Sequence, residues 1–84
     1  MSRGERMSLK LLFFASLREA LGQGSEELDL PASVHDVAGL LAFLAARGGR
    51  WQSLGTFRNL RYAVNQNLAQ LDTPLRAGDE VAFF

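Results

Sequence analysis

One segment of this chain has the apolar spacing of a helix long enough to cover a sheet, and it runs from Val34 to about Arg47. Its apolar residues recur at intervals of three and four positions, which places them on one face of a helix. That face consists of Val34, Val37, Ala38, Leu41, Leu44 and Ala45, widened by Leu40 and Phe43. Ser33 is the expected N-cap, Asp36 follows three residues later, and Gly48–Gly49 ends the helix. Such a helix must bury its apolar face against another layer of structure.

Short apolar segments on both sides of this helix have the composition of strands. We expect strands at Ser8–Ala15, Ser25–Leu30, Arg61–Asn65, Leu68–Leu71 and Glu80–Phe84. A short helix is expected from Ser16 to Gly22, with Ser16 as its cap and Glu19 at the capping-box position. Residues 50–60 follow neither period, which predicts a loop anchored by Trp51 and Phe57.

Strands gathered on one long helix, with a second short helix, indicate a two-layer domain of the α+β class. We expect residues 1–7 to be a flexible N-terminal extension and residues 8–84 to form the single domain. A chain of this size buries roughly two thirds of the surface that it exposes when unfolded. Its 48% hydrophobic content is enough for one core between a sheet and a helix.

The charge balance excludes several classes of function. Nine basic residues offset nine acidic ones, whereas nucleic-acid binding depends on clustered positive charge, so no nucleic-acid partner is expected. No apolar run approaches the length of a membrane span, and residues 1–7 lack the apolar core of a signal peptide. We therefore expect a cytoplasmic protein without membrane contact.

The residue types present also argue against metal and cofactor chemistry. The chain has no cysteine, which excludes disulfides, thiolate nucleophiles and Cys-based metal sites. His35 is the only histidine and is expected to be an exposed residue at the start of the long helix. No metal site, no bound cofactor and no catalytic residue are therefore expected within this chain.

Three stretches resemble the MoaD-type small subunit of molybdopterin synthase. They are Lys10–Glu19 (KLLFFASLRE), Ala63–Gln66 (AVNQ) and Pro74–Phe84 (PLRAGDEVAFF). Their order and spacing cover most of the chain from Leu9 onward. The resemblance implies a ubiquitin-like β-grasp fold, in which a mixed sheet packs on one long helix and the first and last strands are neighbours.

The resemblance also implies a function in molybdenum cofactor biosynthesis. In this family a flexible tail follows the last strand and ends in Gly-Gly, so a C-terminal glycine is expected after Phe84. A ubiquitin-activating-like enzyme uses ATP to adenylate the tail, which then becomes a thiocarboxylate. The large subunit of molybdopterin synthase receives the tail in a heterotetramer and uses its sulfur to form the dithiolene. The small subunit is thus a non-catalytic part of a sulfurtransferase complex.

Strand alternation predicts the surface that would bind these partners. If Leu9, Leu11 and Phe13 face the helix, alternate residues of the first and last strands face outward. The expected partner-binding residues are Leu12, Phe14, Arg18, Leu68 and Phe84, with Ala82 beside them. An exposed apolar patch of this kind marks a protein-binding surface. Alternatively, residues 50–60 fold over this face and bury it.

Two other functions are compatible with these residues. A thiamine-pathway sulfur carrier has the same expected fold and tail chemistry but delivers sulfur to a different acceptor. A ubiquitin-like binding module would use the sheet face alone and carry no sulfur.

Overall fold

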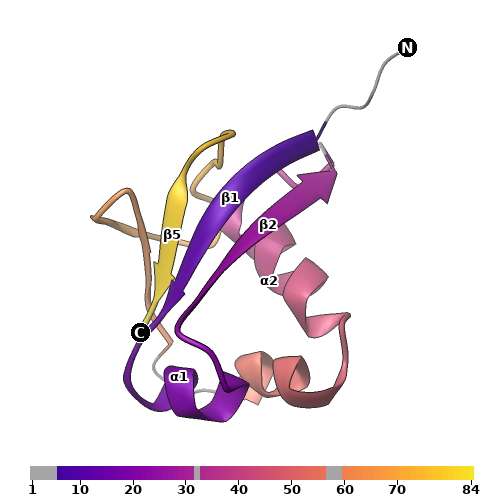
Figure 1. The fold of residues 1–84 in the computed structure, drawn as a ribbon. Helices are drawn as coiled ribbons and strands as arrows, with labels where there is room; N and C mark the ends of the chain where they lie inside the picture. The colour runs from indigo at the N-terminus through magenta and orange to yellow at the C-terminus, as the bar shows by residue number, and fades with distance from the viewer. Residues whose placement is uncertain (1–5, 32, 57–59) are drawn as a thin grey trace.

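A computed structural model describes residues 6–31, 33–56 and 60–84 of the chain. Within these residues five strands form one mixed sheet in the order β2-β1-β5-β3-β4. The strands are β1 (Arg6–Phe13), β2 (Ser25–Pro31), β3 (Tyr62–Val64), β4 (Asn67–Ala69) and β5 (Glu80–Phe83). Helix α2 (Val37–Ala45) lies across one face of the sheet, and α1 (Ala15–Leu21) follows β1 at one end of it (Figure 1).

The first and last strands are parallel neighbours at the centre of the sheet, with Leu11 opposite Val81. This is the arrangement expected from the resemblance, and β2 lies at an edge of the sheet. Strand β1 begins at Arg6, two residues before its expected start, because it continues to pair with β2 as far as Pro31. Of the expected flexible extension, residues 1–5 lie outside the described residues.

The strand pair β3–β4 turns one residue earlier than predicted. Asn65 and Gln66 occupy the turn with φ angles of 51° and 73°, and Val64 pairs with Asn67. Positive φ at both central positions is typical of the two-residue turn that matches the twist of a hairpin, and asparagine tolerates it well. The turn therefore includes Asn65, which had been assigned to the strand.

Helix α2 begins three residues later than its apolar spacing predicts. Its N-cap is Asp36, whose carboxylate accepts a hydrogen bond of 2.8 Å from the Gly39 amide, so the Ser33 cap is wrong. Tertiary contacts explain the difference, since Leu75 N donates to the His35 carbonyl and Asp36 forms a bridge with Pro74. This pairing holds the backbone before the helix in an extended form.

The short helix α1 is also capped differently from the prediction. Phe14 is its N-cap and provides no side-chain hydrogen bond, so the Ser16 capping box is wrong. Its C-terminal end is as expected. Gly22 adopts a left-handed conformation with φ of 77°, and its amide donates to the Arg18 carbonyl.

Gly49–Thr56 form a 3-10 helix, η1, where a loop was expected. Trp51 anchors it as predicted, with its ring 5.7 Å from that of Phe13 in an edge-to-face contact. Because Phe13 faces the buried side of the sheet, η1 packs on the α2 side and leaves the opposite face of the sheet uncovered by these residues. The alternative in which this segment covers the open face is therefore wrong for Gly49–Thr56, whereas Phe57 lies outside the described residues.

The core lies between the sheet and α2, and its sheet side is the one that alternation predicts. Leu9, Leu11, Phe13, Val81 and Phe83 are each at most 2% exposed. On the helix side, Val37, Leu40 and Leu44 are fully buried, whereas Leu41 is half-buried and Ala38 exposed. The buried face of α2 is thus centred on Leu40 rather than on Leu41.

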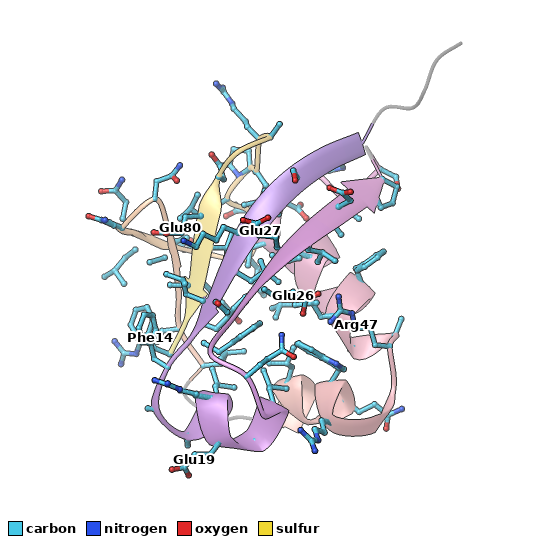
Figure 2. The ribbon with its side chains drawn as sticks, in the orientation of Figure 1. Phe14, Glu19, Glu26, Glu27, Arg47 and Glu80 are labelled. Carbon is cyan, nitrogen blue, oxygen red and sulfur yellow. The ribbon has the colours of Figure 1, made fainter. Side chains whose placement is uncertain are left out.

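An ion pair joins β2 to the segment that follows α2 (Figure 2). The Arg47 guanidinium donates two hydrogen bonds to the Glu26 carboxylate, one of 3.0 Å to Oε1 and a shorter one to Oε2. It also lies 4.5 Å from the centre of the Trp51 ring, a cation–π contact. The hydrogen bonds from Arg47 lower the pKa of Glu26.

Glu26→Gln is expected to lower the free energy of unfolding by about 0.5–1 kcal/mol at neutral pH, as for a well-aligned surface ion pair. A carboxylate whose pKa is lowered by folding stabilises the protein above the ordinary glutamate pKa of about 4.3. That contribution disappears as pH falls through the lower pKa of the folded state. Urea unfolding of both proteins across pH 7 to 3 should therefore show two curves that converge in acid. A difference independent of pH would contradict an ionic contribution.

Candidate protein-binding face

Four apolar residues line up across the face of the sheet that points away from α2. Strand pairing places Leu12 opposite Ala82, Ala82 opposite Ala63, and Ala63 opposite Leu68. The neighbouring residues on β3 and β5 face the other way, since the Tyr62 and Phe83 rings contact each other on the α2 side. The row therefore crosses four strands without a polar side chain.

Two exposed phenylalanines lie beside this row, where β1 and β5 end. Phe14 is 47% exposed and Phe84 is 43% exposed. Their backbones are held in place, since Phe14 N donates to Phe83 O and Phe84 exchanges two hydrogen bonds of 2.7 and 3.0 Å with Arg61. We call this surface the apolar face; it is formed by Leu12, Phe14, Leu68, Ala82 and Phe84 around the buried Ala63.

The next row toward the other end of the sheet is charged. Lys10 is opposite Glu27 on one side and Glu80 on the other. Figure 2 shows Glu27 and Glu80 on this part of the sheet, with Phe14 at the end near α1. Charged residues are depleted from the centres of protein interfaces and tolerated at their rims. The Lys10 row thus sets a polar boundary for the apolar face.

The structure places four of the five predicted partner-binding residues on the apolar face. Phe14, Leu68 and Phe84 are exposed there, whereas Leu12 is half-buried in the middle of the sheet. Arg18 is exposed but lies on α1, and its side chain packs beside Gly24. The structure does not bring Arg18 into the row, and its role in binding stays a prediction.

Sequence reasoning missed Ala63, which occupies the middle of the row. The signal was present, because Ala63 alternates with Tyr62 and Val64 in the same way as Ala82 alternates with Val81 and Phe83. Ala63 is buried and Ala82 is half-buried, so the large exposed side chains of the face are those of Leu68, Phe14 and Phe84.

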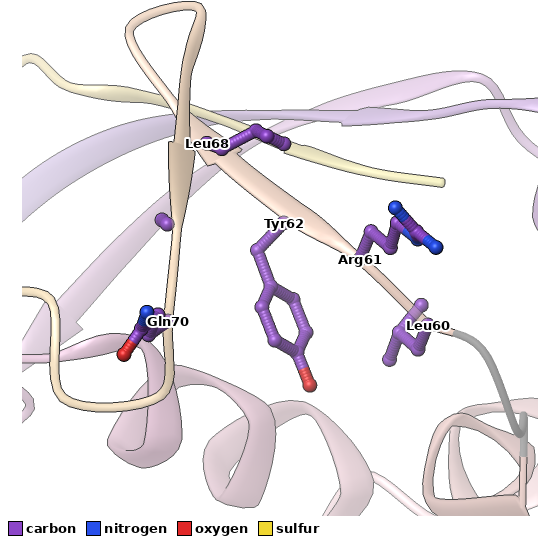
Figure 3. A pocket seen from close by; sticks show the side chains of 6 residues that line it. Leu60, Arg61, Tyr62, Leu68 and Gln70 are labelled. Atoms are coloured by element: carbon purple, nitrogen blue, oxygen red, sulfur yellow. The ribbon is translucent and has the colours of Figure 1, made fainter.

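A hollow of about 340 Å³ lies at one edge of the apolar face (Figure 3). It opens where β3 and β4 separate, and it is lined by Leu60, Arg61, Tyr62, Leu68, Ala69 and Gln70. Figure 3 shows Leu68 and Tyr62 on opposite sides of the strands that frame it. The sequence pattern contains no signal for this hollow.

Chemically, the face is suited to binding rather than to catalysis. Its side chains carry no acid, base or nucleophile. The described part of the chain contains no group of three residues that could hold a metal ion, and the His35 side chain is 76% exposed. In addition, no helix among the described residues is long and apolar enough to cross a membrane.

Comparison with known proteins shows where this arrangement recurs. Residues 11–84 match the model of the ThiS family. The molybdopterin synthase sulfur carrier subunit of Escherichia coli is 42% identical over 76 residues, which cover 90% of this chain and 91% of that protein.

Solved structures have the same fold. A Pyrococcus furiosus protein, described as a candidate subunit 1 of molybdopterin converting factor, superposes with a TM-score of 0.79 at 24% identity, over 93% of this chain and 95% of that one. A Helicobacter pylori chain, solved in a complex of subunits 1 and 2 of molybdopterin-converting factor, has a TM-score of 0.59 at 28% identity, over 93% and 92% of the two chains. The chain therefore belongs to the ThiS family and has its ubiquitin-like β-grasp fold.

Proposed function

We propose that this protein is the sulfur carrier subunit of a molybdopterin synthase and acts in molybdenum cofactor biosynthesis. The observation that carries the proposal is the 42% identity with the Escherichia coli carrier subunit across nine tenths of the chain. The ThiS family match over residues 11–84 is consistent with sulfur carriage.

The large synthase subunit is the proposed partner of the apolar face. The Helicobacter pylori relative was solved as a complex of subunits 1 and 2, which supports a partner of this kind. Phe14, Leu68 and Phe84 supply three large apolar side chains, and burying each contributes about 2 kcal/mol before the costs of association. Because Phe84 follows β5 directly, a tail continuing from it would leave the domain beside the docked partner.

The chemistry of sulfur transfer would take place on that tail and in partner proteins. We propose that a ubiquitin-activating-like enzyme joins the terminal carboxylate to AMP from ATP and releases pyrophosphate. A sulfur donor then displaces AMP and leaves a thiocarboxylate. This domain presents the tail and binds the enzymes, and no ATP is bound by the chain itself.

Two alternatives differ from this proposal in partner or chemistry. A thiamine-pathway carrier would share the fold and tail, but the curated relatives that match over most of the chain are molybdopterin synthase subunits. A ubiquitin-like binding module would use the apolar face without any sulfur on its C-terminus.

Intact mass spectrometry tests sulfur carriage directly. The protein, expressed as its gene encodes it, is incubated with the adenylating enzyme, ATP and a sulfide source. We expect a mass gain equal to one sulfur in place of one oxygen at the C-terminus, with no gain when ATP is omitted. No gain, under conditions in which the Escherichia coli relative is converted, would support the binding module instead.

A further inference from the structure

The hollow beside the apolar face exists because strands β3 and β4 diverge abruptly. They pair up to Tyr62 and Ala69, and the chain then turns away from β3. The backbone N–H of Gln70 donates to the Thr73 hydroxyl, and the backbone N–H of Ala38 donates to the Leu71 carbonyl at a distance of 2.8 Å. These bonds draw the chain after β4 toward α2, so the gap between the strands is built into the fold.

The lining of the hollow combines apolar walls with polar groups. Leu60 and Ala69 pack against the core, while Leu68 is 76% exposed, the largest exposure among the large apolar residues of the described chain. Arg61 is exposed at the same site and has no ion pair among the described residues.

These features fit a side chain rather than a free ligand. Small-molecule sites bury most of the surface of their ligand, whereas this hollow of about 340 Å³ is open to solvent beside the exposed Leu68 and Arg61 side chains. Leu68 belongs both to the hollow and to the apolar face, so the two surfaces are continuous. Phe84 pairs with Arg61, which lines the hollow, so a protein that covers Phe84 reaches the hollow next.

We propose that the hollow receives one apolar side chain of the large synthase subunit, beside a carboxylate or carbonyl that accepts a hydrogen bond from the Arg61 guanidinium. The inference rests on the proposed function, since it assigns a second contact to the same partner. Pockets that accept an anchoring side chain at an interface concentrate binding energy. The hollow thereby fixes how the partner sits relative to the apolar face.

Gln70→Trp tests the proposal by filling the hollow from its edge. Gln70 is exposed, and its hydrogen bonds with Thr73 are made by its backbone, so a larger side chain leaves the turn intact. We expect the affinity for the large subunit, measured by calorimetry, to fall about tenfold, as on loss of a typical anchor pocket. Ala42→Trp is the matched control, because it adds the same side chain on the exposed side of α2 and should bind normally.

Arg61→Gln provides a second test, since it removes the guanidinium and leaves the backbone hydrogen bonds with Phe84 intact, and we expect a threefold or greater loss of affinity, about the effect of one hydrogen bond. Unchanged binding by both variants, while Phe14→Glu no longer binds, would overturn the hollow as a contact site and leave the proposed function standing. Unchanged binding by all three would remove the apolar face as well. A change only in self-association, seen by sedimentation, would assign the hollow to a second copy of this chain and overturn the proposal.

Discussion

Phe14→Glu is expected to weaken binding to the large synthase subunit by about a hundredfold or more. An aromatic anchor at the centre of an interface contributes about 2 kcal/mol or more, and a hundredfold corresponds to about 2.8 kcal/mol. The substitution both removes the anchor and places a carboxylate beside Phe84 at the end of β5, where docking would strip it of water. The two effects add in the same direction.

The fold should tolerate this change. Phe14 is 47% exposed, and its contacts with the rest of the domain include backbone hydrogen bonds to Phe83 and Leu17 that any residue can form. Calorimetry against the large subunit measures the loss, and circular dichroism checks the fold. Ala42→Glu adds the same charge to the exposed side of α2 and should bind as the unaltered protein does. Equal affinities for the two variants would mean that the partner does not use the apolar face.

Alternation along two strands predicted both the core and the face opposite it. Leu11 and Val81 lie opposite each other with no exposed surface, and Leu12 and Ala82 are paired on the other side, as the sequence pattern indicates. Successive side chains of a strand point to opposite faces of the sheet, so assigning one residue to the core assigns a face to every other residue of that strand. The central parallel pair could therefore be oriented without any knowledge of distant contacts.

Features that depend on contacts between distant segments were not predictable in this way. The start of α2 is set by the pairing of His35 and Asp36 with Leu75 and Pro74, and the apolar spacing carries no trace of that pairing. A 3-10 helix has three residues per turn, which matches neither the period of an α-helix nor that of a strand, so the sequence pattern predicted a loop in place of η1. The hollow arises where two strands separate, which local patterns do not encode.

Adjacent phenylalanines at the end of the chain provide a direct test of the two faces. Phe83 is fully buried, with its ring stacked on Phe13 at 5.6 Å, whereas Phe84 is 43% exposed on the apolar face. Phe83→Ala is expected to lower the free energy of unfolding by about 3–5 kcal/mol, because the cavity adds to the lost apolar burial. A domain of this size has about 5–15 kcal/mol in total, so the variant should be near the limit of stability.

Phe84→Ala should have the opposite profile. Both hydrogen bonds with Arg61 are made by the backbone and survive the substitution, so stability should change by less than about 1 kcal/mol. Its affinity for the large subunit should fall about tenfold, since one exposed anchor is lost. Urea unfolding and calorimetry on the pair separate the two roles. Comparable destabilisation by the two substitutions would show that Phe84 is part of the core, and the apolar face would then lose the residue from which the tail is proposed to begin.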